Sequence, residues 1–96
     1  MRRASRTDAN QGVIVQAAES AFCSVLQLHQ VGGGCPDLLI GRKGRYGPEN
    51  LLVEVKTDDG TLTPDQIRFH REWRGQKAIV RSVDDLLKLL HRTKGG

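Results

Sequence analysis

The sequence predicts an α/β fold in which a mixed sheet is flanked by helices. Along the chain, segments with the short apolar or alternating pattern of strands are interspersed with segments of helical periodicity. A stretch dense in turn residues, 42–50, joins two strand-like segments into a hairpin. A well-capped helix, beginning near residue 63, lies between this hairpin and a last strand. Alternating strands and helices around a central hairpin imply a mixed sheet.

The first helix is predicted from about Asp8 to Phe22. Asp8 and Gln11, three residues apart, resemble an N-terminal capping pair. Val15, Ala18 and Phe22 recur at helical spacing, and we expect them to form a stripe along this helix.

Three strands are predicted to follow. Residues 25–30 nearly alternate between apolar and polar types, whereas 37–41 is a short apolar run. The glycines at 32–34 separate these two strands and form a flexible turn, since no phosphate-binding G-K-[ST] follows them. The third strand, 51–56 (LLVEVK), is expected to pair with the second across the turn at 42–50.

The second helix has clear end signals. Thr63 is its predicted N-cap, Pro64 its first residue, and Gln66 completes a capping box with Thr63. Gly75 provides the stop, and 77–81 (KAIVR) reads as the fourth strand.

A last helix is predicted after Ser82, its N-cap. Asp84 and Asp85 lie in its first turn and Lys88 towards its end, a charge order that complements the helix dipole. Its expected buried stripe is Val83, Leu86, Leu87 and Leu90. The chain is expected to form a single domain, 1–96, with short flexible tails at about 1–7 and 93–96.

Composition excludes several classes of protein. A chain of 96 residues can bury one modest core. No apolar run approaches the ~20 residues of a membrane span, and no signal-peptide segment follows the basic N-terminus, so we expect an intracellular protein. Cys23 and Cys35 are too few for a disulfide scaffold and are expected to be reduced thiols in or near the core.

Basic residues exceed acidic residues by 15 to 11, which gives a net charge of +4. They gather in four groups: Arg2, Arg3 and Arg6; Arg42, Lys43 and Arg45; Arg68, Arg71 and Arg74; and Lys88, Arg92 and Lys94. Such groups attract a polyanion in a salt-dependent way, although a solubilising surface has the same composition.

The chemically informative residues are Asp37, Glu54 and Lys56. Strand side chains alternate between faces, so Glu54 and Lys56 share one face of their strand. If the second and third strands pair as a hairpin, Asp37 lies opposite the far end, near that pair. Two carboxylates and an ammonium group then converge at one end of the sheet.

This set suits phosphoryl hydrolysis. Carboxylate oxygens hold Mg²⁺ or Mn²⁺, which can activate a bound water and neutralise phosphate charge. Lys56 can orient the attacking water or stabilise the charge that develops on the phosphate oxygens. The same spacing is equally compatible with a same-face ion pair between Glu54 and Lys56, with Asp37 as a turn residue.

The ordered set GGGCPDLLIG, LLVEVK and LTPDQ resembles the PD-(D/E)XK nuclease superfamily, and within it the compact VRR-NUC branch found in stand-alone phage proteins. The similarity runs from about residue 8 to 90. It implies a restriction-endonuclease-like α-β-β-β-α-β core and divalent-metal cleavage of DNA that leaves a 5′-phosphate. By position, it implies that Asp37 and Glu54 are metal ligands beside the main-chain carbonyl of Val55, and that Lys56 is the catalytic lysine.

The resemblance also bears on the helices. VRR-NUC proteins carry a glutamine in the second helix, where Gln66 shares a stripe with Phe69 and Trp73. Related nucleases often add an acid from the first helix; that place falls at Gln11, with Glu19 as an alternative. Trp73 is otherwise expected in the core. The eponymous Val-Arg-Arg is only partly present, because the fourth strand ends in Val80-Arg81-Ser82.

The resulting hypothesis is a structure-selective DNA endonuclease of phage or prophage origin acting in a bacterial host, and specifically a Holliday-junction resolvase working as a homodimer. Its expected cofactor is Mg²⁺ or Mn²⁺. Its expected DNA contacts are Arg42, Lys43, Arg45, Arg68, Arg71 and Arg81. The alternatives are a nicking or flap endonuclease and a non-catalytic DNA-binding subunit.

Overall fold

A computed structural model gives the structure of the protein and describes residues 6–93. The elements in chain order are α1 (Arg6–Ser20), β1 (Ser24–Gln27), β2 (Leu38–Gly44), β3 (Gly47–Val55), α2 (Pro64–Glu72), β4 (Lys77–Val80) and α3 (Val83–Thr93). The predicted α/β class and the α-β-β-β-α-β order are confirmed, and α3 follows that core. The predicted tails lie outside the described residues at 1–5 and 94–96, whereas residues 6, 7 and 93 are helical.

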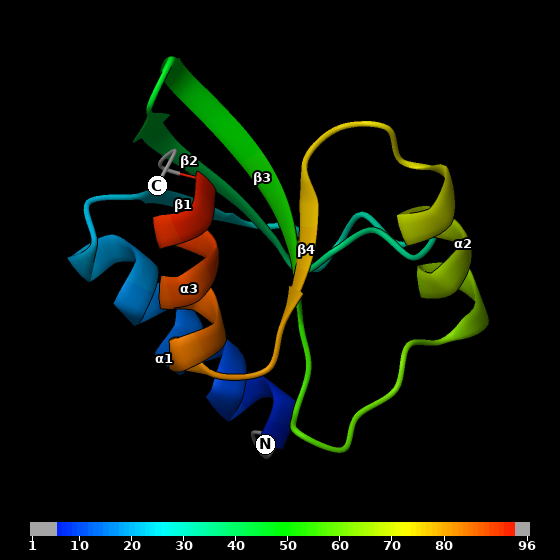
Figure 1. The fold of residues 1–96 in the computed structure, drawn as a ribbon. Coiled ribbons are helices and arrows are strands. Elements are labelled where there is room, and N and C mark those ends of the chain that lie inside the picture. Colours follow the sequence, from blue (N-terminus) through cyan, green and yellow to red (C-terminus); the bar gives the residue numbers. More distant parts are fainter. Residues whose placement is uncertain (1–5, 94–96) are drawn as a thin grey trace.

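The four strands form one mixed sheet in the order β1-β2-β3-β4. β1, β2 and β3 are antiparallel neighbours, and β4 runs parallel to β3. Helices α1 and α3 lie on one face of this sheet, and α2 lies on the other (Figure 1). The parallel pairing follows from α2, which carries the chain across the sheet between β3 and β4.

The core lies between the sheet and the α1/α3 pair. Leu51, Val53 and Val55 point from β3 into it and are at most 2% exposed. Ile14 and Leu86 are fully buried on α1 and α3. Cys23 is also buried, as predicted, and Cys35 is half-buried; both are free thiols. The alternate residues of β3 face α2 instead, and this alternation places the polar residues of the strand on the α2 side.

The β2–β3 hairpin is longer than predicted. Residues 42–50 were expected to form a connection, but cross-strand pairing continues to Gly44 and Gly47, so only Arg45 and Tyr46 form the turn. Within this extension Arg42 and Glu49 are paired, with Arg42 Nε 2.7 Å from Glu49 Oε1. Opposite charges on facing residues stabilise a ladder, and they override the turn-rich composition.

The predicted end of α1 at Phe22 is wrong. The helix ends at Ser20, and Phe22 adopts a left-handed backbone conformation with φ of 66°. Its side chain is 96% exposed and does not continue the stripe of Ala18, which is fully buried. The left-handed residue reverses the chain direction, so that Cys23 enters the core in place of Phe22.

Both N-caps predicted in the second half of the chain are confirmed by hydrogen bonds. Thr63 N donates to Gln66 Oε1 at 2.9 Å, and Gln66 N donates to Thr63 Oγ1 at 3.2 Å, as predicted for α2. At α3, Asp85 N donates to Ser82 Oγ at 3.1 Å, which confirms Ser82 as the N-cap.

The apolar faces of these two helices differ from expectation. In α3, Leu86 and Leu90 are buried as predicted, but Leu87 is 47% exposed and Leu89 packs on the core instead. No residue of α2 is buried. Trp73, expected in the core, caps α2, stacks on Phe69 and is 44% exposed. Within residues 6–93, no helix has the length and apolar character that crossing a bilayer requires.

Arg42 gives a test of the hairpin. Its side chain is 6% exposed, and its guanidinium also donates to the carbonyl of Leu90 at the end of α3. We expect Arg42→Ala to lower the free energy of unfolding by about 3 kcal/mol, because Glu49 loses its buried partner. The exposed neighbour Lys43 is the matched control, and Lys43→Ala should change stability by less than about 0.5 kcal/mol. Equal urea midpoints for the two variants would contradict this role of Arg42.

Candidate active site

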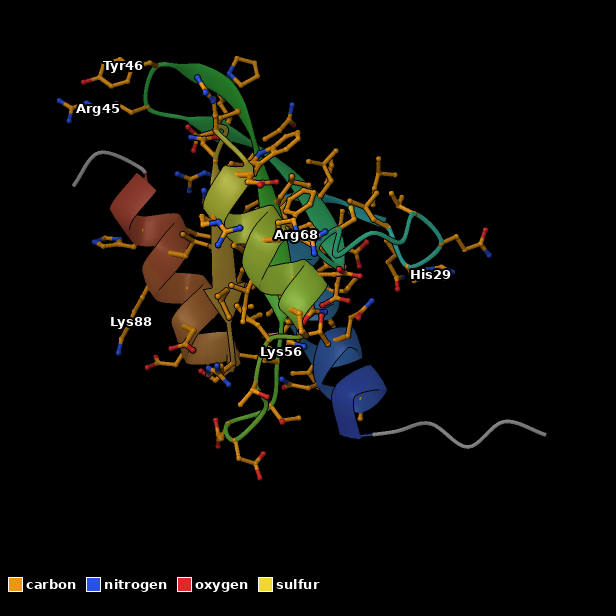
Figure 2. The ribbon with its side chains drawn as sticks, turned by 90° about the vertical axis from the view of Figure 1, so that its right-hand side faces the viewer. His29, Arg45, Tyr46, Lys56, Arg68 and Lys88 are labelled. Carbon is orange, nitrogen blue, oxygen red and sulfur yellow. The ribbon has the colours of Figure 1, made fainter. Side chains whose placement is uncertain are left out.

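The site lies where β2 begins and β3 ends, on the face of the sheet that α2 covers. The structure brings together Asp37, Glu54, Lys56 and Gln66. Asp37 precedes β2, and its Oδ2 accepts a hydrogen bond of 2.8 Å from the Val55 N–H. Lys56 Nζ lies 4.0 Å from Glu54 Oε2, and Gln66 Nε2 donates to the same oxygen at 3.4 Å. Figure 2 looks onto this face and labels Lys56 below α2.

Glu54 is the most unusual residue of the site, because it is a carboxyl group that is only 1% exposed. The pKa of Glu54 is raised to about 8, first by burial and then by the hydrogen bond and charge of the adjacent Asp37, while Lys56 acts to lower it. A hydrogen bond between two carboxyl groups requires a proton on one of them. Without a cation, the pair therefore holds a proton at neutral pH.

The donor set fits a hard divalent cation. No described donor group reaches the buried Oε1 of Glu54, and two adjacent carboxylates are stabilised when a cation replaces their shared proton. Across residues 6–93, no cluster of three or more His, Cys, Asp or Glu side chains is arranged to hold a metal. The protein thus offers two carboxylates, a number typical of Mg²⁺ sites that keep several waters.

Gly34 determines how closely α2 approaches the site. It has a φ of 80°, and a Cβ on it would lie 2.3 Å from the main-chain oxygen of Asp65 and 3.0 Å from Gln66 N. Only glycine tolerates both the left-handed backbone and this contact. The sequence predicted only a flexible turn at 32–34; the structure shows that the loop supports the first turn of α2, from which Gln66 reaches Glu54.

Asn10 of α1 is a contributor that sequence reasoning missed. Its Nδ2 donates to the main-chain oxygens of Lys56, at 2.8 Å, and of Arg81, at 3.3 Å. It therefore joins α1 to the ends of β3 and β4 where Lys56 leaves the sheet. The neighbouring candidate, Gln11, donates to Gln27 of β1 at 3.2 Å, and Glu19 is exposed on α1. No sequence motif includes Asn10, so the sequence offered no signal that could have identified it.

Cys35 is a second residue that was not connected with the site from sequence. Burial, and then the charges of Glu54 and Asp37, raise the pKa of its thiol. The thiol therefore stays protonated at neutral pH and is a poor nucleophile. Its position two residues before Asp37 in the GCPD string was the available signal.

The expected phosphate contacts fall into two groups. Two arginines are engaged within the protein: Arg42 with Glu49 and α3, and Arg81, whose NH1 donates to the carbonyls of Thr57 at 2.7 Å and Gly60 at 2.6 Å. Arg81 thus holds the loop that follows β3.

The other four candidates have solvent-exposed side chains. Arg68 and Arg71 lie on α2, with side chains 61% and 70% exposed, beside Asp65 and Glu72 respectively. Lys43 is exposed on the hairpin, and Arg45 packs over Tyr46 at its tip. Figure 2 shows Arg68 on α2, between the hairpin tip and Lys56.

The raised pKa of Glu54 predicts a pH dependence of stability when cations are chelated. The carboxyl has an ordinary pKa of 4.5 in the unfolded chain and about 8 in the fold. Between these values the folded state binds more protons, so the free energy of unfolding should fall as pH rises. We expect Glu54→Gln to remove this decline in urea denaturation with EDTA, and the exposed Glu72→Gln to retain it. An identical pH slope in wild type and Glu54→Gln would refute the shared proton.

The comparisons with known proteins agree with this geometry. The VRR-NUC domain family matches residues 6–84, a range that contains all four residues of the site. No curated protein and no solved structure shows significant similarity to the chain. Because the match covers most of the chain, the protein belongs to the VRR-NUC family of nuclease domains.

Proposed function

We propose that the protein is a divalent-metal-dependent endonuclease that hydrolyses phosphodiester bonds in branched DNA, with the four-way Holliday junction as its principal substrate. The observation that carries this proposal is the buried Glu54, with one oxygen unpartnered, between the carboxyl of Asp37 and the ammonium of Lys56. A structural ion pair would be more stable on the surface, where desolvation costs nothing. A cation and a phosphate account for the buried Glu54, the half-buried Asp37 and the adjacent ammonium group of Lys56.

We assign the cation to Asp37, Glu54 and the main-chain carbonyl of Val55, with Mg²⁺ or Mn²⁺ as the ion. When bound, it would activate a water and neutralise phosphate charge. Asp37 Oδ2 is held by the Val55 N–H at 2.8 Å, which fixes the first carboxylate on the strand that carries the second. Gln66 holds Glu54 Oε2, so the unpartnered Oε1 remains for the ion.

Lys56 acts on the phosphate and the attacking water. Its side chain is 15% exposed, so its charge is little screened by solvent and acts at the mouth of the site. The ammonium group attracts the scissile phosphate and stabilises the additional negative charge in the transition state. Water attacks phosphorus and the bond to the 3′ oxygen breaks, which leaves a 5′-phosphate and a 3′-hydroxyl.

The substrate class rests on charge and size. The chain carries a net charge of +4, and Arg68, Arg71, Lys43 and Arg45 present exposed cations for phosphate contacts. A domain of this size offers little surface for reading bases, so recognition of DNA shape through phosphates is favoured. Symmetric cutting of a four-way junction requires two sites, and we therefore propose a homodimer. The resemblance to stand-alone phage proteins supports a phage or prophage origin in a bacterial host.

A nicking or flap endonuclease is the second candidate. One Asp37–Glu54–Lys56 set, as residues 6–93 contain it, suffices to cut a single strand, so this candidate requires no second copy of the chain. A non-catalytic DNA-binding subunit leaves the desolvated Glu54 unexplained.

The first test is cleavage of labelled linear, nicked, flapped and four-way DNA with Mg²⁺ or Mn²⁺. We expect Lys56→Ala to reduce the cleavage rate about 10²- to 10³-fold, because a charge-stabilising group is lost. EDTA should abolish cutting. The control is Lys88→Ala, which removes an exposed lysine paired with Asp84 on α3. Binding without metal-dependent cutting by the wild type would remove the enzyme hypothesis, and a preference for nicked or flapped DNA would select the second candidate.

Gln66 allows its capping role to be separated from its role in the site. Gln66→Glu keeps an acceptor for the Thr63 N–H but replaces the donor to Glu54 with a third carboxyl group. We expect stability to change by less than about 1 kcal/mol, and cleavage or metal affinity to fall about 10- to 100-fold, as for other residues that orient a metal ligand. Thr63→Ala, which removes only the cap, should lower the free energy of unfolding and leave cleavage and metal affinity nearly unchanged. A Gln66→Glu enzyme with wild-type metal dependence would limit Gln66 to capping.

A further inference from the structure

Two aromatic side chains near the hairpin are almost fully solvent-exposed. Phe22 is 96% exposed and Tyr46 is 91% exposed, so neither ring contributes to the core. Between β1 and the hairpin lies a groove of about 500 Å³, lined by the ion pair of Arg42 and Glu49 and by Phe22, Ser24, Gly41, Lys43, Pro48 and Asn50. We refer to the last six of these residues, with the tip residues Arg45 and Tyr46, as the hairpin groove.

Phe22 reduces the stability of the fold. A φ of 66° in a residue with a Cβ is strained, and an exposed aromatic ring recovers none of that cost through burial. Strained residues of this kind concentrate at functional sites, where a binding partner requires the side chain in that place. The position of Phe22 therefore indicates a ligand for its ring.

The hairpin groove is an extension of the catalytic face. Ser24 pairs with Gly41, and Gly41 pairs with Asn50. Asn50 and Glu54 lie on the same side of β3, since they are separated by an even number of residues, and the distance between them along the strand is about 13 Å. Figure 2 shows Arg45 and Tyr46 at the far end of this face from Lys56. A DNA strand at the carboxylates can therefore reach the groove within a few nucleotides.

We propose that the hairpin groove binds an unpaired nucleobase of the DNA substrate, and so selects branched over intact duplex DNA. This inference rests on the proposed nuclease function. An aromatic ring stacks on the face of any base, a contact that needs no particular sequence. In an intact duplex these faces are covered by neighbouring base pairs, whereas an unpaired base at a branch or flap exposes them.

Charge favours DNA over a second copy of the chain at this surface. Lys43 is exposed beside Phe22, and the Arg45 guanidinium lies 5.3 Å from the centre of the Tyr46 ring. The contact with Arg45 limits the orientations of the Tyr46 ring, which reduces the entropy lost on stacking. A two-fold interface formed by this surface would bring the cations of both copies together, whereas phosphates flanking a bound base would neutralise them.

The test compares affinities in a Lys56→Ala background with EDTA present, so that the DNA stays intact during the measurement. The probes are a labelled duplex and the same duplex with a single-stranded flap. We expect Phe22→Ala and Tyr46→Ala each to weaken flap binding about 5- to 150-fold, the range for loss of one stacked base, and duplex binding by less than about twofold. Phe22→Tyr should retain flap binding. Leu87→Ala, which removes an exposed apolar side chain on the opposite side of the sheet, is the matched control.

Phe22→Asn provides a second measurement. Asparagine tolerates the left-handed conformation, so we expect its urea midpoint to rise while flap affinity falls as in Phe22→Ala. Unchanged flap affinity, or equal losses on duplex and flap, would overturn the proposal. A fall from dimer to monomer mass in Phe22→Asn would also overturn it, since the surface would then hold a second copy. Absence of DNA binding and of metal-dependent cutting in the wild type would instead reject the nuclease function on which the proposal rests.

Discussion

The proximity of two carboxyl groups in a buried corner of the sheet is the constraint on which the rest of the structure depends. Burial, and then the hydrogen bond and charge of Asp37, raise the pKa of Glu54 to about 8, so the two acids are not both charged there without a cation. Common structural features hold the two carboxyl groups in this unfavourable arrangement. The β2–β3 ladder sets the two acids side by side, the Val55 N–H fixes one, and Gln66 fixes the other.

Sequence patterns predicted the strands, the helices and the grouping of Asp37, Glu54 and Lys56, because each depends on local periodicity or on a motif with fixed spacing. The capping box at Thr63 and Gln66 is local in the same sense, and it was found where expected. The hairpin extension was missed because the Arg42–Glu49 pair stabilises it from across the ladder. Cross-strand contacts of this kind cannot be read from one segment, and Gly and Pro in 42–50 indicated a loop.

The errors in burial have a related origin. Phe22 fitted the helical stripe, but helix α1 ends two residues earlier, and the left-handed turn places Cys23 in the core instead. The charge groups were equally ambiguous. Arg42 and Arg81 lie in basic or motif-like strings, yet the structure engages them with Glu49, α3 and the loop after β3. A count of the basic residues therefore overstates the positive charge available to a binding partner, because some of these side chains are engaged in contacts within the protein.

Helix α2 supplies Gln66 to the candidate site although none of its own residues is buried. The contacts that join it to the rest of the domain include the close approach at Gly34 and the hydrogen bond from Gln66 to Glu54, whereas the Phe69–Trp73 stack lies within the α2 segment itself. Elements with so little buried apolar surface open at a lower free energy than the global unfolding of the domain. The core between the sheet and the α1/α3 pair can therefore remain intact while α2 moves away from the sheet. Only a fraction of the molecules then has Gln66 beside Glu54, and a bound substrate can increase that fraction.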